Sequence, residues 1–236
     1  MHGVVAMLRF DSVVLAQDGF RLVADWQVPA GAKVAVIGPS GAGKSTLLSA
    51  VAGFFAPAQG RVLWQGSDLA PLNPGARPMT ILFQDQNLFP HLTLGQNLGL
   101  GLRPDLRLDP PQRAQVDAVL DRVGLNGLGA RRPAQLSGGQ VGRAALARAL
   151  LRARPMLLLD EPFAALGPAL KAEMLALVDE VAIETGALVL MVTHDPTDAL
   201  AFAEMTVLVA EGVAHAPTRT GLLLKDPPPA LRAYLG

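Results

Sequence analysis

The segment Gly38–Thr46 (GPSGAGKST) combines glycines, one lysine and hydroxyl residues at a spacing that suits the binding of phosphate groups. It fits the pattern G-x-x-x-x-G-K-S/T, in which glycines let backbone N–H groups converge on phosphate oxygens. Lys44 would supply positive charge, and the Ser45 hydroxyl would bind Mg²⁺. We therefore predict a nucleotide-binding loop formed by Gly38, Pro39, Ser40, Gly41, Ala42, Gly43, Lys44, Ser45 and Thr46.

Two adjacent carboxylates, Asp160 and Glu161, follow the apolar run LLL. In open α/β sheets, ligands bind at the carboxyl ends of the strands. Asp160 is therefore predicted to hold Mg²⁺, directly or through water, and Glu161 is predicted to polarise an attacking water. Asp-Glu-Pro would also suit a solvated turn, but the phosphate loop in the same chain favours the catalytic interpretation.

Two further polar residues end apolar runs: Gln84 follows TILF, and His194 follows LVLMVT. The Gln84 amide is predicted to contact Mg²⁺ or the attacking water, and His194 is predicted to donate a hydrogen bond to the terminal phosphate. Taken alone, this glutamine would be an ordinary surface residue and this histidine a structural one. Their place beside the other predicted site residues favours a catalytic role for both.

The segment LSGGQ, Leu136–Gln140, places two glycines at the start of an alanine-rich helical pattern. Ser137 and Gln140 are spaced as a capping box, which is a sufficient structural explanation by itself. A capped helix N-terminus with bare glycines is also an anion site, but this one has no lysine of its own. In a two-fold dimer, each chain would place this half-site against the partner's phosphate loop. We therefore predict that Ser137, Gly138, Gly139 and Gln140 bind nucleotide across a homodimer interface.

Alternating strand and helix patterns are expected to position these residues. Short apolar runs predict buried parallel strands, and apolar residues at helical spacing predict the helices between them. The predicted strands are 34–38, 61–64, 79–83, 156–159, 188–192 and 206–209, and the predicted helices include 44–52, 112–123 and 168–185. This alternation predicts an α/β protein with a mostly parallel sheet. A helix-rich stretch from residue 87 to residue 150 interrupts it.

The composition limits the classes of function. The 236 residues are 50% apolar and 17% charged, with a formal net charge of zero and no cysteine. A core can therefore form, disulfides and thiolate metal sites are excluded, and no surplus of positive charge indicates nucleic acid as a partner. No run of about 18 apolar residues is present, so the chain is not expected to span a membrane itself.

In their order and spacing, these motifs resemble those of the ATP-binding-cassette (ABC) ATPases, and the resemblance extends over essentially the whole chain. It implies a P-loop NTPase fold with a RecA-like α/β core, an antiparallel β subdomain and a helical subdomain that contains LSGGQ. We expect one ABC ATPase domain, 1–236, with the core in 1–86 and 151–236 and the helical subdomain in 87–150. The resemblance also implies that ATP and Mg²⁺ bind between two copies and that hydrolysis lets the copies separate.

Within this family, the chain is most similar to the ATPases of importers, in particular those for thiamine (vitamin B1). The segments that resemble that subfamily are FQDQNLFPHLTLGQNLGLGL, RPAQLSGGQ and DEPFAALGPALKAEMLALV. The resemblance implies a homodimeric, peripheral ATPase at the cytoplasmic face of the bacterial inner membrane. Its partners would be integral membrane permease subunits, whose coupling helices enter a groove near Gln84, and indirectly a periplasmic substrate-binding protein. No nucleic-acid partner is expected.

The chain departs from the family pattern at three places. Gly167 stands where the family usually has an aspartate through which the two protomers sense each other. Gly142 replaces a usual glutamine in the helix after LSGGQ, at a cost of roughly 1 kcal/mol relative to alanine. Gln17 occupies the position of an aromatic residue that commonly stacks on adenine, and Phe20 is a nearby substitute.

Three alternatives to a thiamine-import ATPase remain open at this point. The chain would also serve an importer of another small solute, because in this family the cargo never contacts this subunit. The two glycine substitutions, at positions 142 and 167, would also suit a slow nucleotide-dependent switch or interaction module. A cassette ATPase that acts on DNA or ribosomes is disfavoured, because such proteins usually contain long coiled-coil inserts or two cassettes in one chain.

Overall fold

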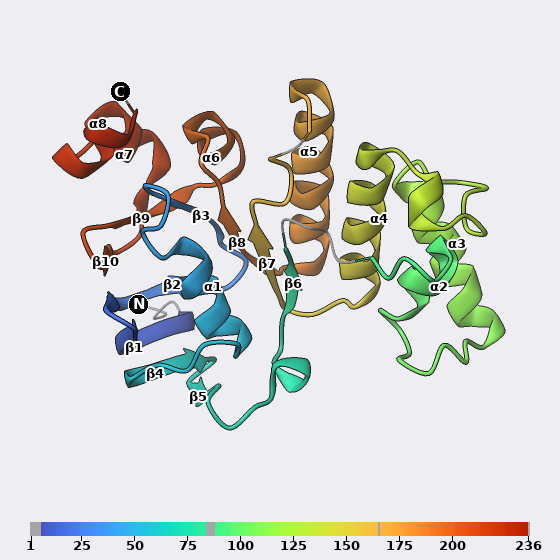
Figure 1. Ribbon diagram of the computed structural model, residues 1–236, viewed down its shortest axis with the longest axis horizontal. Helices are drawn as coiled ribbons and strands as arrows, with labels where there is room; N and C mark the ends of the chain where they lie inside the picture. Colours follow the sequence, from blue (N-terminus) through green and yellow to red (C-terminus); the bar gives the residue numbers. More distant parts are fainter. Residues whose placement is uncertain (1–5, 84–87, 165, 236) are drawn as a thin grey trace.

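The computed structural model describes residues 6–83, 88–164 and 166–235, and a long mixed sheet forms its centre (Figure 1). The strands are β1 (Ala6–Gln17), β2 (Phe20–Pro29), β3 (Lys33–Ile37), β4 (Gln59–Trp64), β5 (Ser67–Asp68), β6 (Thr80–Leu82), β7 (Met156–Asp160), β8 (Leu188–Val192), β9 (Met205–Ala210), β10 (Val213–Ala214) and β11 (Thr218–Arg219). Their order is β5-β4-β1-β2-β10-β9-β3-β8-β7-β6, and β11 pairs with β9. The α-helices are α1 (Lys44–Ala52), α2 (Leu94–Gly99), α3 (Pro110–Arg122), α4 (Gly138–Leu151), α5 (Pro168–Thr185), α6 (Pro196–Phe202), α7 (Thr220–Lys225) and α8 (Pro229–Leu235). The predicted α/β class is confirmed.

Five neighbouring strands, β9-β3-β8-β7-β6, run parallel and have helices on both faces. Successive residues of β3 point to opposite faces. Val34 and Val36 pack in the cluster that contains α1, whereas Ala35 and Ile37 pack in the cluster that contains α5. Because both faces are buried, these strands are continuous apolar runs, which is why the sequence predicts them. Their carboxyl ends meet at one edge of the sheet and position the residues that follow.

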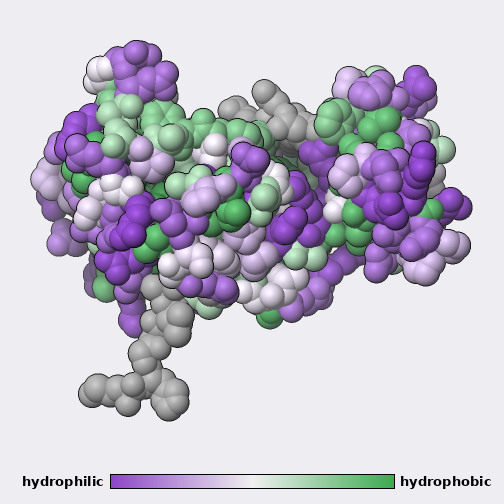
Figure 2. Space-filling view, turned by 90° about the horizontal axis from the view of Figure 1, so that it is seen from below, coloured by the Kyte–Doolittle hydropathy of each residue, from purple (hydrophilic) through white to green (hydrophobic). Residues whose placement is uncertain are grey.

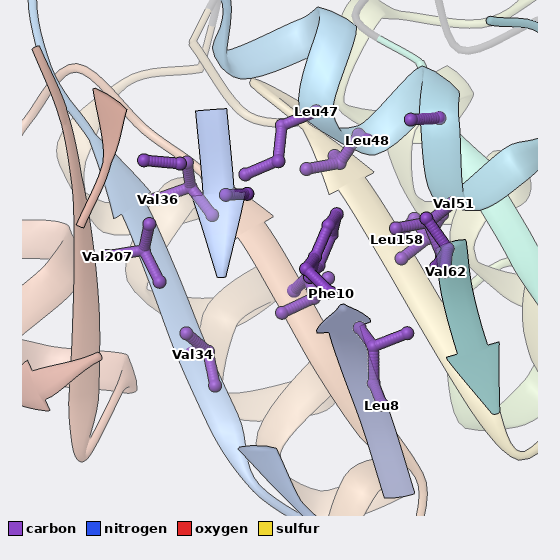
Figure 3. Close-up of a cluster of buried hydrophobic side chains, with 14 of the residues drawn as sticks. Leu8, Phe10, Val34, Val36, Leu47, Leu48, Val51, Val62, Leu158 and Val207 are labelled. Atoms are coloured by element: carbon purple, nitrogen blue, oxygen red, sulfur yellow. The ribbon is translucent and has the colours of Figure 1, made fainter. Parts of the chain in front are cut away.

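The strands β5-β4-β1-β2 form an antiparallel part of the sheet, which β10 joins to the parallel part. Phe10 of β1 and Trp26 of β2 have ring centroids 4.3 Å apart. Figure 3 shows Phe10 in the same apolar cluster as Leu48 and Val51 of α1, with residues of the parallel strands nearby. The helix that follows the phosphate loop is therefore held by apolar packing against both parts of the sheet.

The helical part, α2–α4, lies between β6 and β7 in the chain and at one end of the molecule (Figure 1). Its own apolar cluster includes Leu94, Leu98, Val116 and Leu120, and α4 also packs on the parallel strands through Leu146. Hydrophilic residues cover most of its outer surface in the view from below (Figure 2, right). In the described parts of the chain, no helix is long and apolar enough to cross a membrane.

Most predicted elements occur close to their predicted bounds. The helix predicted for 168–185 and the strand predicted for 188–192 match α5 and β8. The strand predicted to end at Gly38 ends one residue earlier, because Gly38 has a positive φ of 149° and begins the phosphate loop. The strands β1 and β2 and the helices α6, α7 and α8 were not predicted. The division of the chain at residues 87 and 150 into subdomains stays a prediction.

Candidate active site

The predicted phosphate loop connects β3 to α1, and close contacts require glycine at two of its positions. A Cβ on Gly38 would lie 2.0 Å from the carbonyl oxygen of Val209. Gly43 is the N-cap of α1 with φ 104°, and a Cβ there would lie 2.6 Å from the ring of Phe20. A larger residue would therefore displace the loop or its neighbours. The loop leads directly into the N-terminus of α1, an arrangement that suits the binding of an anion.

Lys44, the first residue of α1, is buried with its ammonium group inside the loop. Its Nζ donates hydrogen bonds to the carbonyl oxygens of Gly38 (2.8 Å) and Pro39 (2.9 Å). Burial lowers the pKa of Lys44, and the charges of Glu161 and Asp160 act in the opposite direction. These contacts hold the positive charge where a phosphate group would approach the loop.

Ser45 and Asp160 bring two oxygen atoms together from α1 and β7. The Ser45 hydroxyl donates a hydrogen bond of 2.9 Å to Asp160 Oδ1. Burial raises the pKa of Asp160, the Ser45 hydrogen bond lowers it, and the neighbouring charge of Glu161 raises it again. Mg²⁺ is usually bound by one or two carboxylates together with water and phosphate oxygens. A hydroxyl and a carboxylate at this separation therefore fit Mg²⁺.

Glu161 and His194 meet because they follow the adjacent parallel strands β7 and β8. Glu161 Oε2 lies 3.4 Å from His194 Nδ1. The Glu161 backbone has a positive φ of 47°, and its N–H donates a hydrogen bond of 3.2 Å to the carbonyl oxygen of Val192. A glutamate in the left-handed region is strained and persists only where surrounding contacts fix it. The carboxylate is thus held at the end of its strand, beside the imidazole.

The segment after β8 is also bound by residues that the sequence analysis did not single out. Lys171, in the first turn of α5, donates hydrogen bonds to Asp195 (2.9 Å) and Asp198 (3.0 Å). The Tyr234 hydroxyl, in α8, donates a hydrogen bond of 2.5 Å to the carbonyl oxygen of His194. No local spacing indicates these pairs, because Lys171 and Asp195 are 24 residues apart and Tyr234 and His194 are 40 apart.

The LSGGQ segment begins α4 with the predicted capping box. Ser137 Oγ accepts a hydrogen bond of 3.3 Å from the Gln140 N–H, and Gln140 Oε1 accepts one of 2.9 Å from the Ser137 N–H. A Cβ on Gly139 would lie 2.4 Å from Leu170 of α5, whereas one on Gly138 would meet no described neighbour within 4 Å. Figure 1 shows β7 and α5 between α4 and α1. This segment therefore lies apart from the phosphate loop of its own chain.

Two sequence predictions remain, one on Gln84 and one on an aromatic residue beside the phosphate loop. Gln84 lies outside the described residues, so its contact with Mg²⁺ or water stays a prediction. Gln17 is exposed at the end of β1, whereas Phe20 is half-buried at the start of β2 and its ring lies against Gly43. Phe20 is therefore an aromatic side chain next to the phosphate loop. This position is compatible with its predicted role, which is to stack on adenine in place of the residue at position 17.

A groove of about 890 Å³ lies between β6 and α4. Its described lining includes the aromatic residues Phe83 and Phe89 and the cations Arg148, Arg152 and Arg154, but no carboxylate. Burial lowers the pKa of Arg148 and of Arg152, and in each case a neighbouring arginine lowers it further. The groove therefore combines apolar surface with concentrated positive charge.

Comparison with known proteins places these features in one family. Residues 23–164, which contain the phosphate loop, LSGGQ and the two carboxylates, match the family model described as ABC transporter. A Thiamine import ATP-binding protein ThiQ of Cereibacter sphaeroides is 68% identical over 230 residues, which cover 98% of this chain and 100% of that protein. A protein of the same name from Ruegeria sp. is 56% identical with the same coverage. Another from Yersinia pestis is 50% identical over 206 residues, 87% of each chain.

Proposed function

Because the chain belongs to the ABC transporter family, we propose that it is the ATP-hydrolysing subunit of an importer for thiamine. The proposal rests mainly on the 68% identity to a protein named for thiamine import, which spans 98% of this chain and all of that relative. The motifs that bind nucleotide in this family lie in the matched residues. ATP is therefore the substrate of the site described above.

The phosphate side of the proposed reaction depends on residues of α1 and β7. Lys44 neutralises charge on the transferred phosphoryl group, and backbone N–H groups of the loop Gly38–Thr46 bind the adjacent phosphate groups of the nucleotide. Ser45 and Asp160 would hold Mg²⁺, with Gln84 as a further predicted ligand. Bound Mg²⁺ would supply a Lewis acid that offsets the charge of the phosphate oxygens.

The water side of the proposed reaction depends on the ends of β7 and β8. Glu161 accepts a hydrogen bond from the attacking water and orients it in line with the bond to be broken. His194 donates a hydrogen bond to the γ-phosphate, next to Glu161, from which its Nδ1 is 3.4 Å away. Preorganised groups of this kind stabilise the charge of the transition state without moving at the moment of reaction.

We infer that the active unit is a homodimer in which each chain's LSGGQ segment meets the partner's phosphate loop. The segment lies apart from its own phosphate loop and offers helix N–H groups without a lysine. Two-fold symmetry would produce two identical composite sites. We expect Glu161→Gln to trap this dimer with bound ATP, because binding persists while hydrolysis stops. Light scattering with and without ATP measures the change in mass, and a variant that stays monomeric with ATP would contradict the homodimer.

The permease subunits are proposed to bind in the groove between β6 and α4. An amphipathic helix with an apolar face and acidic residues would suit its aromatic lining and its three arginines. In this assembly the chain is peripheral, at the cytoplasmic face of the bacterial inner membrane. A periplasmic substrate-binding protein would act on it only through the permease.

The test of the proposed function is ATP hydrolysis by the chain purified with its native permease subunits and binding protein. We expect thiamine to raise the rate and Glu161→Gln to abolish it. Glu204→Gln is the matched control, because Glu204 is an exposed carboxylate just before β9, and it should keep the wild-type rate. Strong hydrolysis that is indifferent to thiamine would retain the transport ATPase and point to another small solute. No hydrolysis with any cargo would favour a slow switch, for which Gly142 and Gly167 are the supporting features.

A further inference from the structure

The C-terminal helix α8 packs on the core of the molecule and is bonded to the segment that precedes it. Leu231 is fully buried among residues of the parallel part of the sheet and α5. Arg232 Nε donates a hydrogen bond of 2.6 Å to the carbonyl oxygen of Pro227, and its Nη2 lies 3.1 Å from Asp226. The helix is therefore a defined platform for the side chains that it presents.

One side chain of this platform, Tyr234, reaches the segment that contains His194. Its hydroxyl donates the 2.5 Å hydrogen bond to the His194 carbonyl oxygen. Directly after His194 in the chain, the side-chain carboxylates of Asp195 and Asp198 accept hydrogen bonds from Lys171. The segment that begins at His194 is thus bonded from two helices: α8 binds the backbone of His194, and α5 binds the side chains of Asp195 and Asp198.

This double attachment matters because the imidazole itself is loosely surrounded. The His194 side chain is 58% exposed, whereas that of Glu161 is 26% exposed. An exposed side chain takes its position largely from the backbone to which it is attached. A rotation of the peptide at His194 would therefore change the 3.4 Å separation between the imidazole and Glu161.

We propose that Tyr234 is a positioning residue for ATP hydrolysis, because its hydroxyl fixes the backbone from which His194 reaches Glu161 and the γ-phosphate. The inference rests on the role proposed above for His194. It makes the C-terminal helix part of the hydrolytic apparatus, although α8 contributes no group that touches the nucleotide.

The surroundings of Tyr234 keep its hydroxyl in the form that donates a hydrogen bond. Burial raises the pKa of Tyr234, and the negative charges of Glu161 and Asp195 raise it further. The phenol therefore remains protonated at neutral pH. Because one of these carboxylates is Glu161, the hydroxyl lies within the electrostatic influence of a proposed catalytic residue.

The test is Tyr234→Phe in the full transporter, because this substitution removes one oxygen atom and keeps the ring. The net value of a single hydrogen bond predicts a kcat that is about threefold to tenfold lower, with the KM for ATP unchanged. Thr185→Val is the matched control. It also removes a hydroxyl that donates to a carbonyl oxygen (Val181, 2.7 Å), but at the opposite end of α5 from Lys171. It should leave kcat unchanged.

A second measurement separates positioning from a purely structural role. In NMR spectra of the full chain with ¹³C-labelled histidine, Tyr234→Phe should shift the His194 ring signal, whereas Thr185→Val should not. An unchanged kcat would overturn the inference. A lower kcat that accompanies a lower melting temperature, with the His194 signal unmoved, would also overturn it. A wild-type transporter without any hydrolysis would overturn the proposed function as well, whereas hydrolysis that Glu161→Gln abolishes and Tyr234→Phe leaves intact would overturn this inference alone.

Discussion

The segments Gly38–Thr46 and Ser137–Gln140 both place glycines at the N-terminus of a helix, yet their surroundings differ. In the first, Lys44 donates to carbonyl oxygens of its own loop, and Ser45 connects the loop to the sheet by donating to Asp160 of β7. In the second, the capping hydrogen bonds join Ser137 and Gln140 of the segment itself. The helix that it begins, α4, is separated from α1 by α5 (Figure 1).

This difference shows how similar local chemistry can give a whole site or half of one. A helix N-terminus carries roughly half a positive charge, whether it belongs to α1 or α4. Only at the first segment is the helix N-terminus accompanied by a lysine and by two oxygen atoms suited to Mg²⁺, one from Ser45 and one from Asp160 of β7. The LSGGQ segment is therefore suited to a phosphate that other residues already hold, and the homodimer proposed above would supply those residues.

The largest expected effect on ATP hydrolysis comes from a substitution at Gly138, in the LSGGQ segment. Gly138→Asp adds a carboxylate where a Cβ meets no described neighbour within 4 Å. A carboxylate near a helix N-terminus is favourable for the helix, so folding should be intact. The same charge would repel the partner's phosphate groups, and ATP hydrolysis by the transporter should fall to background. Gly221→Asp is the matched control at the start of α7, with equally open surroundings, and it should keep full activity.

Mixed dimers distinguish a composite site from a site within one chain. Lys44→Ala should abolish hydrolysis by itself, as Gly138→Asp does. In a dimer that pairs one chain of each kind, one composite site retains both intact halves, so roughly half of the wild-type rate is the upper bound expected from symmetry. Hydrolysis by separately tagged mixed dimers would support exchange of the two segments between chains. Complete inactivity of every mixture would favour a role for LSGGQ within its own chain.

The sequence predicted those elements whose side chains repeat with a clear period and whose ends are marked. The bounds of α1 and α5 agree with the prediction because glycines in the left-handed region, Gly53 and Gly186, end these helices. The strand β1 was not predicted, although it is twelve residues long. Its register shifts between Phe10 and Val13, where Ser12 has a positive φ of 50°, so its apolar residues do not alternate regularly.

The candidate site was predictable where it depends on strand ends and not where it depends on packing between distant helices. Asp160, Glu161 and His194 each follow an apolar run, and parallel strands bring such residues to one edge of the sheet. The contacts of Lys171 and Tyr234 with the segment after β8 depend on how α5 and α8 pack. The paired residues are 24 and 40 positions apart, so no local spacing in the sequence indicates that packing.

Asp160→Asn tests both stability and activity at the site that contains the phosphate loop. Because burial raises the pKa of Asp160, the folded chain binds this proton more tightly than the unfolded chain does. Ionisation therefore destabilises the folded state at pH values above the folded pKa. Asp160→Asn removes that penalty, so we expect a higher melting temperature at pH 8 in the absence of Mg²⁺. Hydrolysis with Mg²⁺ should fall at least about tenfold, because a charged ligand is lost.

The higher melting temperature expected for Asp160→Asn should depend on pH, which provides a further test. As the pH falls through the folded pKa towards the unfolded value of 3.8, both states of the wild-type chain become protonated and the advantage of asparagine should disappear. Asp117→Asn, on the exposed face of α3, should show no such gain at pH 8. A lower melting temperature for Asp160→Asn than for wild type at pH 8 would contradict the assignment of a burial penalty.

The smallest expected effect concerns Gly167, the N-cap of α5. This helix contacts the LSGGQ segment and the segment that follows His194, since Leu170 lies next to Gly139 and Lys171 binds Asp195. Gly167 has φ −65° and no side-chain capping bond, and a Cβ there would meet no described neighbour within 4 Å. Gly167→Asp should therefore fit and raise the free energy of unfolding by about 0.5 kcal/mol, through a new cap and the helix dipole.

Gly167→Ala is the matched control, because it adds a Cβ without a carboxylate and should not stabilise α5. Denaturant unfolding measures the stability of both variants, and ATP hydrolysis by the transporter measures their turnover. If only the aspartate raises turnover, the loop before α5 limits communication between the two composite sites of the wild-type dimer. If the aspartate stabilises the chain without raising turnover, its carboxylate acts only as a local cap, and Gly167 no longer supports a slow switch.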